Sequence, residues 1–346
     1  MKNEKTYWID YLRVFATLSV IVLHVAGGVA NQYGSISNVD WWIGNVYIGS
    51  VRFCVPIFLM ISGALILSKT YESIGEFLKK RFLRILFPFL FWSMIYIARD
   101  IFLQIFGGEN MSIAEILNFT AIQLRDGADY HLWYIYVLIG LYLFFPIIGK
   151  WINKSNKLEI KYFIGIWLLV IIVQLPFMKG TFPNINLIYF SGYIGFPVLG
   201  YYLYKNTFAN SGKEKLVSFF LILVGILITI FGTFYITKRE GFFYHGFYEY
   251  LTPNVILVSV GVFLLFKNLG KFNPRLTSII LFFSKYSYGI FLVHVLVLGA
   301  LTISGFSYPL ANPIIDIPLK SILCFAISTL IVWGINKLPL GKYISG

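Results

Sequence analysis

An apolar stretch near the N-terminus carries three residues whose types and spacing could do chemistry. Residues 10–24 read Asp-Tyr-Leu-Arg-Val-Phe-Ala-Thr-Leu-Ser-Val-Ile-Val-Leu-His, so Asp10, Arg13 and His24 sit in or at the mouth of a predicted membrane helix. At about 100° per residue, Arg13 and His24 project from one helix face about 16 Å apart along the axis, with Asp10 about 40° away. Ionisable groups are costly in lipid, so they turn toward the protein interior and are functional candidates.

The three side chains suit proton transfer beside an anionic ligand. A histidine in the outward half of the helix could act as general base toward a hydroxyl. Arg13 could hold an anionic ligand, or Asp10 could hold Arg13. The structural alternative is an interfacial Asp–Arg pair and one packed histidine. The spacing therefore predicts His24, Arg13 and Asp10 as catalytic residues without excluding that alternative.

A cationic cluster lies at the start of the third apolar run. Lys79, Lys80, Arg81 and Arg84 occupy about a turn and a half of helix. Four cations so close together are more than membrane topology needs. The functional interpretation is a phosphate-rich ligand arriving from the cytoplasm, for which we assign Lys80, Arg81 and Arg84. The alternative is a positively charged cytoplasmic cluster that contacts anionic lipid.

The fourth apolar run opens with aromatic residues and a histidine. Asp129 and His131 precede Trp133 and Tyr134. An aromatic belt at the membrane interface explains the tryptophan and the tyrosine. It does not explain a histidine beside an acid, which together with aromatic rings could grip a sugar. His131, Trp133 and Tyr134 are therefore candidate substrate-binding residues, with the belt as the alternative.

Two further residues complete the candidate substrate site. Arg52 lies within the second apolar run and His294 in the middle of the ninth. The alternatives are an arginine that reaches the outer interface and a buried structural histidine. Cys54 and Cys324 both lie in apolar runs and are expected to be free buried thiols. No ligand-type spacing of His, Cys and Asp occurs, so no metal is expected.

The elements that position these residues are predicted membrane helices. The chain has 346 residues, of which 58% are hydrophobic and 12% charged, whereas a soluble domain has roughly 25% charged residues. We therefore predict an all-α integral membrane protein in which residues 1–346 form one transmembrane domain of about ten helices. The apolar runs fall at roughly 8–30, 44–68, 82–106, 131–149, 160–178, 186–204, 216–237, 251–267, 278–303 and 314–336.

The distribution of lysine and arginine predicts the orientation. These residues concentrate in alternate loops, and such loops face the cytoplasm. Both termini are therefore predicted to be cytoplasmic, in a multi-pass protein of the cytoplasmic membrane. The same bias explains the net charge of +13 without a nucleic-acid partner. The first ten residues lack the character of a cleavable signal, so the first span is expected to remain as an anchor.

Taken together, the motifs resemble those of the membrane-bound acyltransferase family 3. They follow the family's order over almost the whole chain. The matching residues are Arg13 and His24 after Tyr7-Trp8-Ile9-Asp10, Val55-Pro56-Ile57-Phe58 through Ser62-Gly63, Arg81 with Arg84 and Pro88, Tyr130-His131-Leu132-Trp133, Phe196 through Gly200-Tyr201, and Tyr288-Gly289-Ile290 through His294.

The resemblance implies a function. Members of the family transfer an acyl group, usually acetyl, from cytoplasmic acyl-CoA to a hydroxyl of an extracytoplasmic glycan, and the pair Arg13 and His24 is implied to be essential. The chain is similar to short stand-alone members such as the enterobacterial common antigen O-acetyltransferases. No extracytoplasmic SGNH-type domain of the kind found in longer members is expected, which argues against a two-domain relay.

We therefore expect an O-acyltransferase that uses acetyl-CoA or another acyl-CoA and modifies a cell-surface or lipid-linked saccharide. Membrane lipids are its expected surroundings. The alternative is a transporter or flippase of a saccharide or small anion. The sequence shows no inverted repeat of the kind that transporters often carry, which argues against this alternative. The sequence leaves open which acceptor and acyl group are used, whether transfer is direct or proceeds through an acyl-enzyme, and the oligomeric state.

Overall fold

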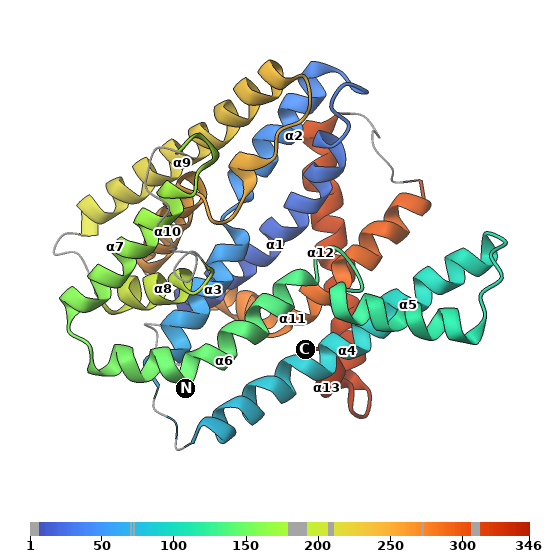
Figure 1. Ribbon diagram of the computed structural model, residues 1–346, viewed down its shortest axis with the longest axis horizontal. Helices are drawn as coiled ribbons and strands as arrows, with labels where there is room; N and C mark the ends of the chain where they lie inside the picture. Colours follow the sequence, from blue (N-terminus) through green and yellow to red (C-terminus); the bar gives the residue numbers. More distant parts are fainter. Residues whose placement is uncertain are drawn as a thin grey trace. The chain divides into compact units, whose positions relative to one another are not determined.

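The computed structural model describes residues 7–69, 71, 73–178, 192–206, 211–270, 273–305 and 312–346. Its regular secondary structure within these residues is helical throughout, as the sequence predicted (Figure 1). The helices are α1 (Tyr7–Ala30), α2 (Asn38–Val51), α3 (Cys54–Ile66), α4 (Ile74–Phe106), α5 (Ile113–Asp126), α6 (Trp133–Lys154), α7 (Lys157–Val173), α8 (Gly195–Lys205), α9 (Ser211–Glu240), α10 (Pro253–Lys267), α11 (Pro274–Ile303), α12 (Pro313–Lys337) and α13 (Gly341–Ile344).

The protein is an all-α integral membrane protein. In the described part of the chain, eight helical segments are long and apolar enough to cross a membrane. They correspond to eight of the expected runs. The other two runs, at 160–178 and 186–204, contain the shorter helices α7, of 17 residues, and α8, of 11 residues. Residues 186–191 of the latter run lie outside the described residues. The cytoplasmic location of both termini stays a prediction.

The chain divides into two compact units, and the single domain expected from the sequence stays a prediction. Unit 1 consists of Met1–Thr70, Phe145–Lys285 and Phe306–Leu323, and unit 2 of Tyr71–Phe144, Tyr286–Gly305 and Cys324–Gly346. In unit 1, α1 packs against α2 and α3, α3 against α8, and α9 along α10. In unit 2, α4 packs against α5 and α13.

Helices α3 and α8 cross with their backbones in contact. A Cβ added at Gly63 would lie 1.9 Å from the Pro197 carbonyl oxygen, and one added at Gly200 would lie 2.2 Å from that of Met60. Each helix therefore supplies one glycine to the crossing, because only glycine leaves room for so close an approach.

Substitution at this crossing should be strongly destabilising. A methyl group in Gly200→Ala overlaps backbone atoms that cannot rotate away, so α3 and α8 must separate and lose their contact. We expect a loss of folded protein, measured as a lower midpoint of thermal unfolding in detergent. Gly140→Ala is the matched control, because a Cβ at that position in α6 meets nothing within 4 Å. Equal midpoints for the two variants would contradict the backbone contact.

The run expected at 44–68 is divided into α2 and α3. The break falls at Arg52 and Phe53. Pro56 explains it, because proline has no amide proton to donate to the Arg52 carbonyl and its ring crowds that carbonyl. Helical hydrogen bonding resumes where Ile57 N donates to Phe53 O at 3.0 Å. Arg52 is thereby placed at the joint between two helices.

Helix α5 was missed between the runs at 82–106 and 131–149. It begins with a capping box, in which the Ser112 hydroxyl accepts from Glu115 N and the Glu115 carboxylate accepts from Ser112 N. The spacing Ser-x-x-Glu is the sequence signal that could have found it. None of its residues is buried. The segment that follows α5 carries Asp129 and His131 and lies, like α5, in unit 2.

Candidate functional site

The first part of the candidate site lies in unit 1, near the start of α1. Arg13 Nη1 donates to Asp10 Oδ1 at 3.1 Å and to Ser284 Oγ at 2.9 Å. Ser284, on α11, in turn donates to the same Asp10 oxygen at 2.6 Å. Asp10 is only 3% exposed, and the Arg13 side chain keeps 26% of its surface. Asp10 therefore holds Arg13, one of the two arrangements that the spacing allowed.

His24 lies on the same unbroken helix and is half-buried. Because α1 runs from Tyr7 to Ala30 without interruption, the common face expected for Arg13 and His24 is kept, with about 16 Å between them along the axis. The structure thus supplies a fixed cation and an imidazole along one helix. Arg13 could orient an anionic or polarised group, and His24, farther along the helix, could accept a proton.

Arg52 is enclosed by aromatic rings in unit 1. Its Nε donates to the Tyr248 carbonyl oxygen at 2.5 Å. Its guanidinium carbon lies 4.3 Å from the centroid of the Tyr250 ring and 5.5 Å from that of Tyr248. The Tyr248 hydroxyl donates to Asn45 Oδ1 at 2.5 Å, which ties the ring to α2. Arg52 is therefore fixed by cation–π contacts rather than extended freely to an interface.

The cationic cluster lies on the first turns of α4, in unit 2. Lys80 and Arg84 are exposed and Arg81 is half-buried, with its guanidinium 5.8 Å from the Phe77 ring centroid. Arg81 Nε is buried without a hydrogen-bond partner among the described residues. The exposed members offer charge-assisted hydrogen bonds to an approaching anion.

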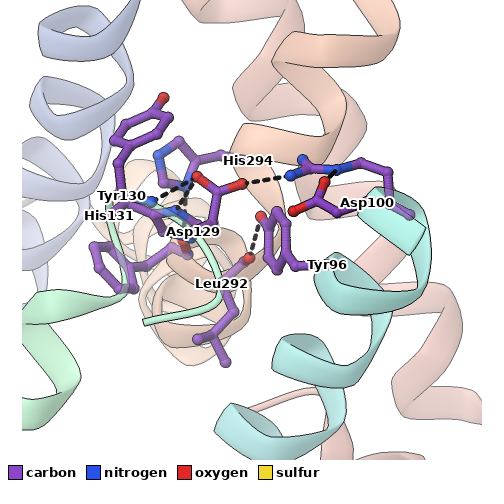
Figure 2. A network of polar contacts seen from close by, with 9 residues as sticks. Tyr96, Asp100, Asp129, Tyr130, His131, Leu292 and His294 are labelled. Carbon is purple, nitrogen blue, oxygen red and sulfur yellow. Dashed lines mark hydrogen bonds and ion pairs between the residues drawn. The ribbon is translucent and has the colours of Figure 1, made fainter. Parts of the chain in front are cut away.

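A second polar cluster, the histidine network, is formed in unit 2 (Figure 2). Arg99 Nε donates to Asp100 Oδ1 at 2.7 Å, and Arg99 Nη2 donates to Asp129 Oδ2 at 3.0 Å. Asp129 Oδ1 lies 3.7 Å from His131 Nδ1. The His131 and His294 rings then meet at 5.0 Å between centroids. We define the histidine network as Tyr96, Arg99, Asp100, Asp129, Tyr130, His131 and His294.

The network joins three segments that are far apart in the sequence. Helix α4 supplies Tyr96, Arg99 and Asp100, the segment after α5 supplies Asp129 to His131, and α11 supplies His294. Tyr96 is fully buried, and its hydroxyl donates to the Leu292 carbonyl on α11 at 2.8 Å. His131 and His294 were expected from the sequence, whereas Tyr96 and Arg99 were not. Arg99 looked like an ordinary charge at the end of an apolar run.

The aromatic residues after His131 divide between the two interpretations. Tyr134 is 6% exposed and packs on Phe291 at 5.5 Å between centroids, so it belongs to the interior of unit 2. Trp133 is half-buried. Tyr130 is 60% exposed, as expected of a belt residue. The belt interpretation is therefore wrong for Tyr134.

The structure groups the predicted site residues by unit. Asp10, Arg13, His24 and Arg52 lie in unit 1, whereas the cationic cluster and His131, Trp133, Tyr134 and His294 lie in unit 2. Cys54 and Cys324 are buried free thiols, as expected. Among the described residues, no group of three or more His, Cys, Asp or Glu side chains could hold a metal ion.

Comparison with known proteins identifies related chains. A family model described as an acyltransferase domain matches residues 6–335. A relative from Bacillus subtilis (strain 168), the putative membrane-bound acyltransferase YfiQ, is 24% identical over 357 residues, which cover 97% of this chain and 92% of the relative. No solved structure matches.

Proposed function

We propose a specific donor and acceptor for this chain, which belongs to the acyltransferase family that its sequence resembles. It is a multi-pass membrane acyltransferase. The proposed donor is acetyl-CoA or another short acyl-CoA. The proposed acceptor is a hydroxyl of an extracytoplasmic cell-surface or lipid-linked saccharide, as in the enterobacterial common antigen type, and the proposed location is the cytoplasmic membrane. The observation that carries the proposal is the Asp10–Arg13–Ser284 contact on the helix that bears His24.

The proposed reaction is a thioester-to-ester transfer. His24 accepts the proton of the acceptor hydroxyl while the oxygen attacks the acyl carbonyl. The new C–O bond forms, the C–S bond breaks, and the thiolate of coenzyme A leaves and takes up a proton. Arg13, held by Asp10 and Ser284, positions the donor. A fixed guanidinium orients its ligand without paying the entropy of immobilising a free arginine side chain.

The proposed substrate contacts are those expected from the sequence, for each group of residues by itself. Lys80, Arg81 and Arg84 would bind the phosphates of coenzyme A, which enters from the cytoplasm. Arg52, His131, Trp133, Tyr134 and His294 would contact the acceptor. Aromatic rings beside hydrogen-bonding groups support a saccharide, because sugars offer both apolar ring faces and hydroxyls.

The cationic cluster yields a direct prediction for donor binding. Arg81→Ala combined with Arg84→Ala should raise KM for acetyl-CoA by about tenfold or more, because hydrogen bonds to charged groups contribute about 1.5–3 kcal/mol each. The turnover number should change much less. Steady-state kinetics with acetyl-CoA varied would measure both. Lys157→Ala with Lys161→Ala is the control, since both lysines are exposed cations on α7. An unchanged KM in the arginine variant would remove this role.

The decisive experiment is thioester cleavage by the purified protein in lipid. Acetyl-CoA and crude surface glycan would be supplied, and free coenzyme A and glycan-bound acetyl would be measured together. Equal release of the two supports the proposal. Movement of saccharide across the bilayer without consumption of acyl-CoA, tried with acetyl, succinyl and longer donors, would favour the transporter instead.

A further inference from the structure

His131 is buried among four aromatic rings, and one of these, the ring of Tyr130, belongs to a residue that is itself 60% exposed. His131 is 2% exposed, and the rings of Tyr96, Tyr130, Phe291 and His294 lie 5.0–5.8 Å from it between centroids. Packing of this kind fixes the plane of an imidazole. Neither ring nitrogen has a hydrogen-bond partner within the part of the chain described, although Nδ1 faces Asp129 at 3.7 Å.

Asp129 decides which ring nitrogen of His131 carries the proton. Burial acts to raise the pKa of Asp129, but the neighbouring His131 and the Arg99 guanidinium together outweigh it, and the pKa lies below its ordinary value. Asp129 is therefore ionised at neutral pH, and an ionised carboxylate can only accept hydrogen bonds. The His131 nitrogen that faces it is Nδ1, so the neutral ring carries its proton there and has a lone pair on Nε2.

Asp129 is itself fixed from two directions. One oxygen accepts from Arg99 Nη2 and the other from the backbone N–H of Tyr130 at 2.7 Å. Arg99 is in turn fixed by Asp100. This chain of contacts leaves the carboxylate little freedom to turn away from His131, which is how an orienting acid acts on a histidine in enzymes.

His294 has the same tautomer for a separate reason. Its Nδ1 lies 2.6 Å from the Phe291 carbonyl oxygen, which can only accept, so Nδ1 carries the proton. The His294 ring meets that of His131 at an interplanar angle of 77°. Two imidazoles thus stand side by side with their Nδ1 protons assigned by oxygen acceptors. No side chain in this part of the structure offers a donor to His131 Nε2.

We propose that Arg99 and Asp129 are positioning residues that hold His131 with its proton on Nδ1, so that Nε2 accepts a hydrogen bond from a hydroxyl of the acceptor substrate. This inference rests on the proposed function and deepens it. The ligand class follows from the chemistry, because a buried lone pair requires a donor and the hydroxyls of a saccharide are donors. A carboxylate or a phosphate dianion would offer this nitrogen none. His24 keeps its role as base.

The tautomer can be measured without any activity. The protein contains four histidines, so ¹⁵N NMR of ring-labelled protein in lipid nanodiscs can be assigned with single His→Gln variants. We expect neutral His131 to show a protonated Nδ1 and an unprotonated Nε2. In Asp129→Asn a single acceptor oxygen remains for Arg99 on one side and for Tyr130 N–H on the other. The charged Arg99 should take it, because hydrogen bonds to charged groups are the stronger ones, so the NH₂ group should face His131 and move its proton to Nε2. Asp126→Asn is the control, since Asp126 is an exposed acid that pairs with Arg125 and contacts no member of the histidine network. A wild-type His131 with its proton on Nε2 overturns the proposal.

Kinetics test the contact with the acceptor. Asp129→Asn should raise KM for crude surface glycan by about tenfold, because Nε2–H cannot accept from the hydroxyl, which must turn to accept instead and leaves its own proton without the acceptor that Nε2 provides. KM for acetyl-CoA should stay the same. His131→Gln should lose glycan binding similarly, and Asp129→Glu should restore much of it. A merely structural role would not separate the two KM values. If Asp129→Asn keeps the wild-type KM for glycan, the inference fails while the proposed function stands. Should the wild type cleave no acyl-CoA, the proposed function fails instead, and with it the acceptor contact, whatever the NMR shows of the tautomer.

Discussion

Replacement of His24 by alanine is expected to lower kcat for acyl transfer by about 10²–10⁴-fold, the range that one general base contributes. The hydroxyl is then attacked without removal of its proton, while donor binding is left in place. KM for acetyl-CoA should therefore change little. The measurement is release of coenzyme A by wild-type and variant protein in the same lipid, at saturating acetyl-CoA and glycan.

Two comparisons make the His24 result specific. His245→Ala removes the one histidine that is exposed and to which no role is assigned, and it should leave kcat unchanged. The unfolding midpoint of His24→Ala should match the wild type, because the side chain is only half-buried. Cleavage that survives in His24→Ala would move the base to another residue, with His131 and His294 tested next.

Asp10→Ala is expected to damage both folding and catalysis. It leaves the Arg13 guanidinium without its carboxylate beside a buried serine, and removal of one partner of a buried pair costs about 3–5 kcal/mol. Because Arg13 keeps 26% side-chain exposure, the lower end of that range applies. Chemical unfolding in detergent would measure the loss. Ser284→Ala keeps the ion pair and should cost only about 1 kcal/mol.

A second substitution separates the two effects of Asp10. In the double variant Asp10→Ala with Arg13→Met, no unpaired charge is left, so much of the stability should return. Catalysis should not return, because methionine cannot position an anion. A double variant as unstable as Asp10→Ala alone would show that the carboxylate acts through contacts other than Arg13. Recovered activity would exclude Arg13 from the reaction.

The correct predictions from the sequence concern residues that lie close together in the chain, within one helix. The common face of Arg13 and His24 follows from helix periodicity, and the Asp10–Arg13 contact spans three residues. The sequence could not show that Ser284, far along the chain, completes this contact, since that depends on how α11 packs on α1. Pro56 explains the break at Arg52, and the capping box is the signal that could have revealed helix α5, but it lies within a longer polar stretch.

In the histidine network, too, only the contact between residues close together in the chain could be predicted from the sequence. Asp129 and His131 are near neighbours in the sequence, and their association could be expected. The position of His294 against His131, and of Arg99 against Asp129, depends on tertiary packing of α4 and α11 within unit 2. A histidine in an apolar run gives no signal of which distant ring it will meet. The Arg52 contacts with Tyr248 and Tyr250 were hidden for the same reason.

The glycine crossing of α3 and α8 has a mechanical consequence. Packed helices usually slide by switching rotamers of the side chains between them, but at Gly63 and Gly200 the two backbones meet directly and no side chain separates them. We therefore expect α3 and α8 to move together as one rigid body. A movement that admits a substrate to unit 1 would then bend the chain where the helical structure is interrupted. The joint of Arg52 and Phe53, at the start of α3, is such an interruption. Arg52, which is proposed to contact the acceptor, would then lie at the hinge of this movement.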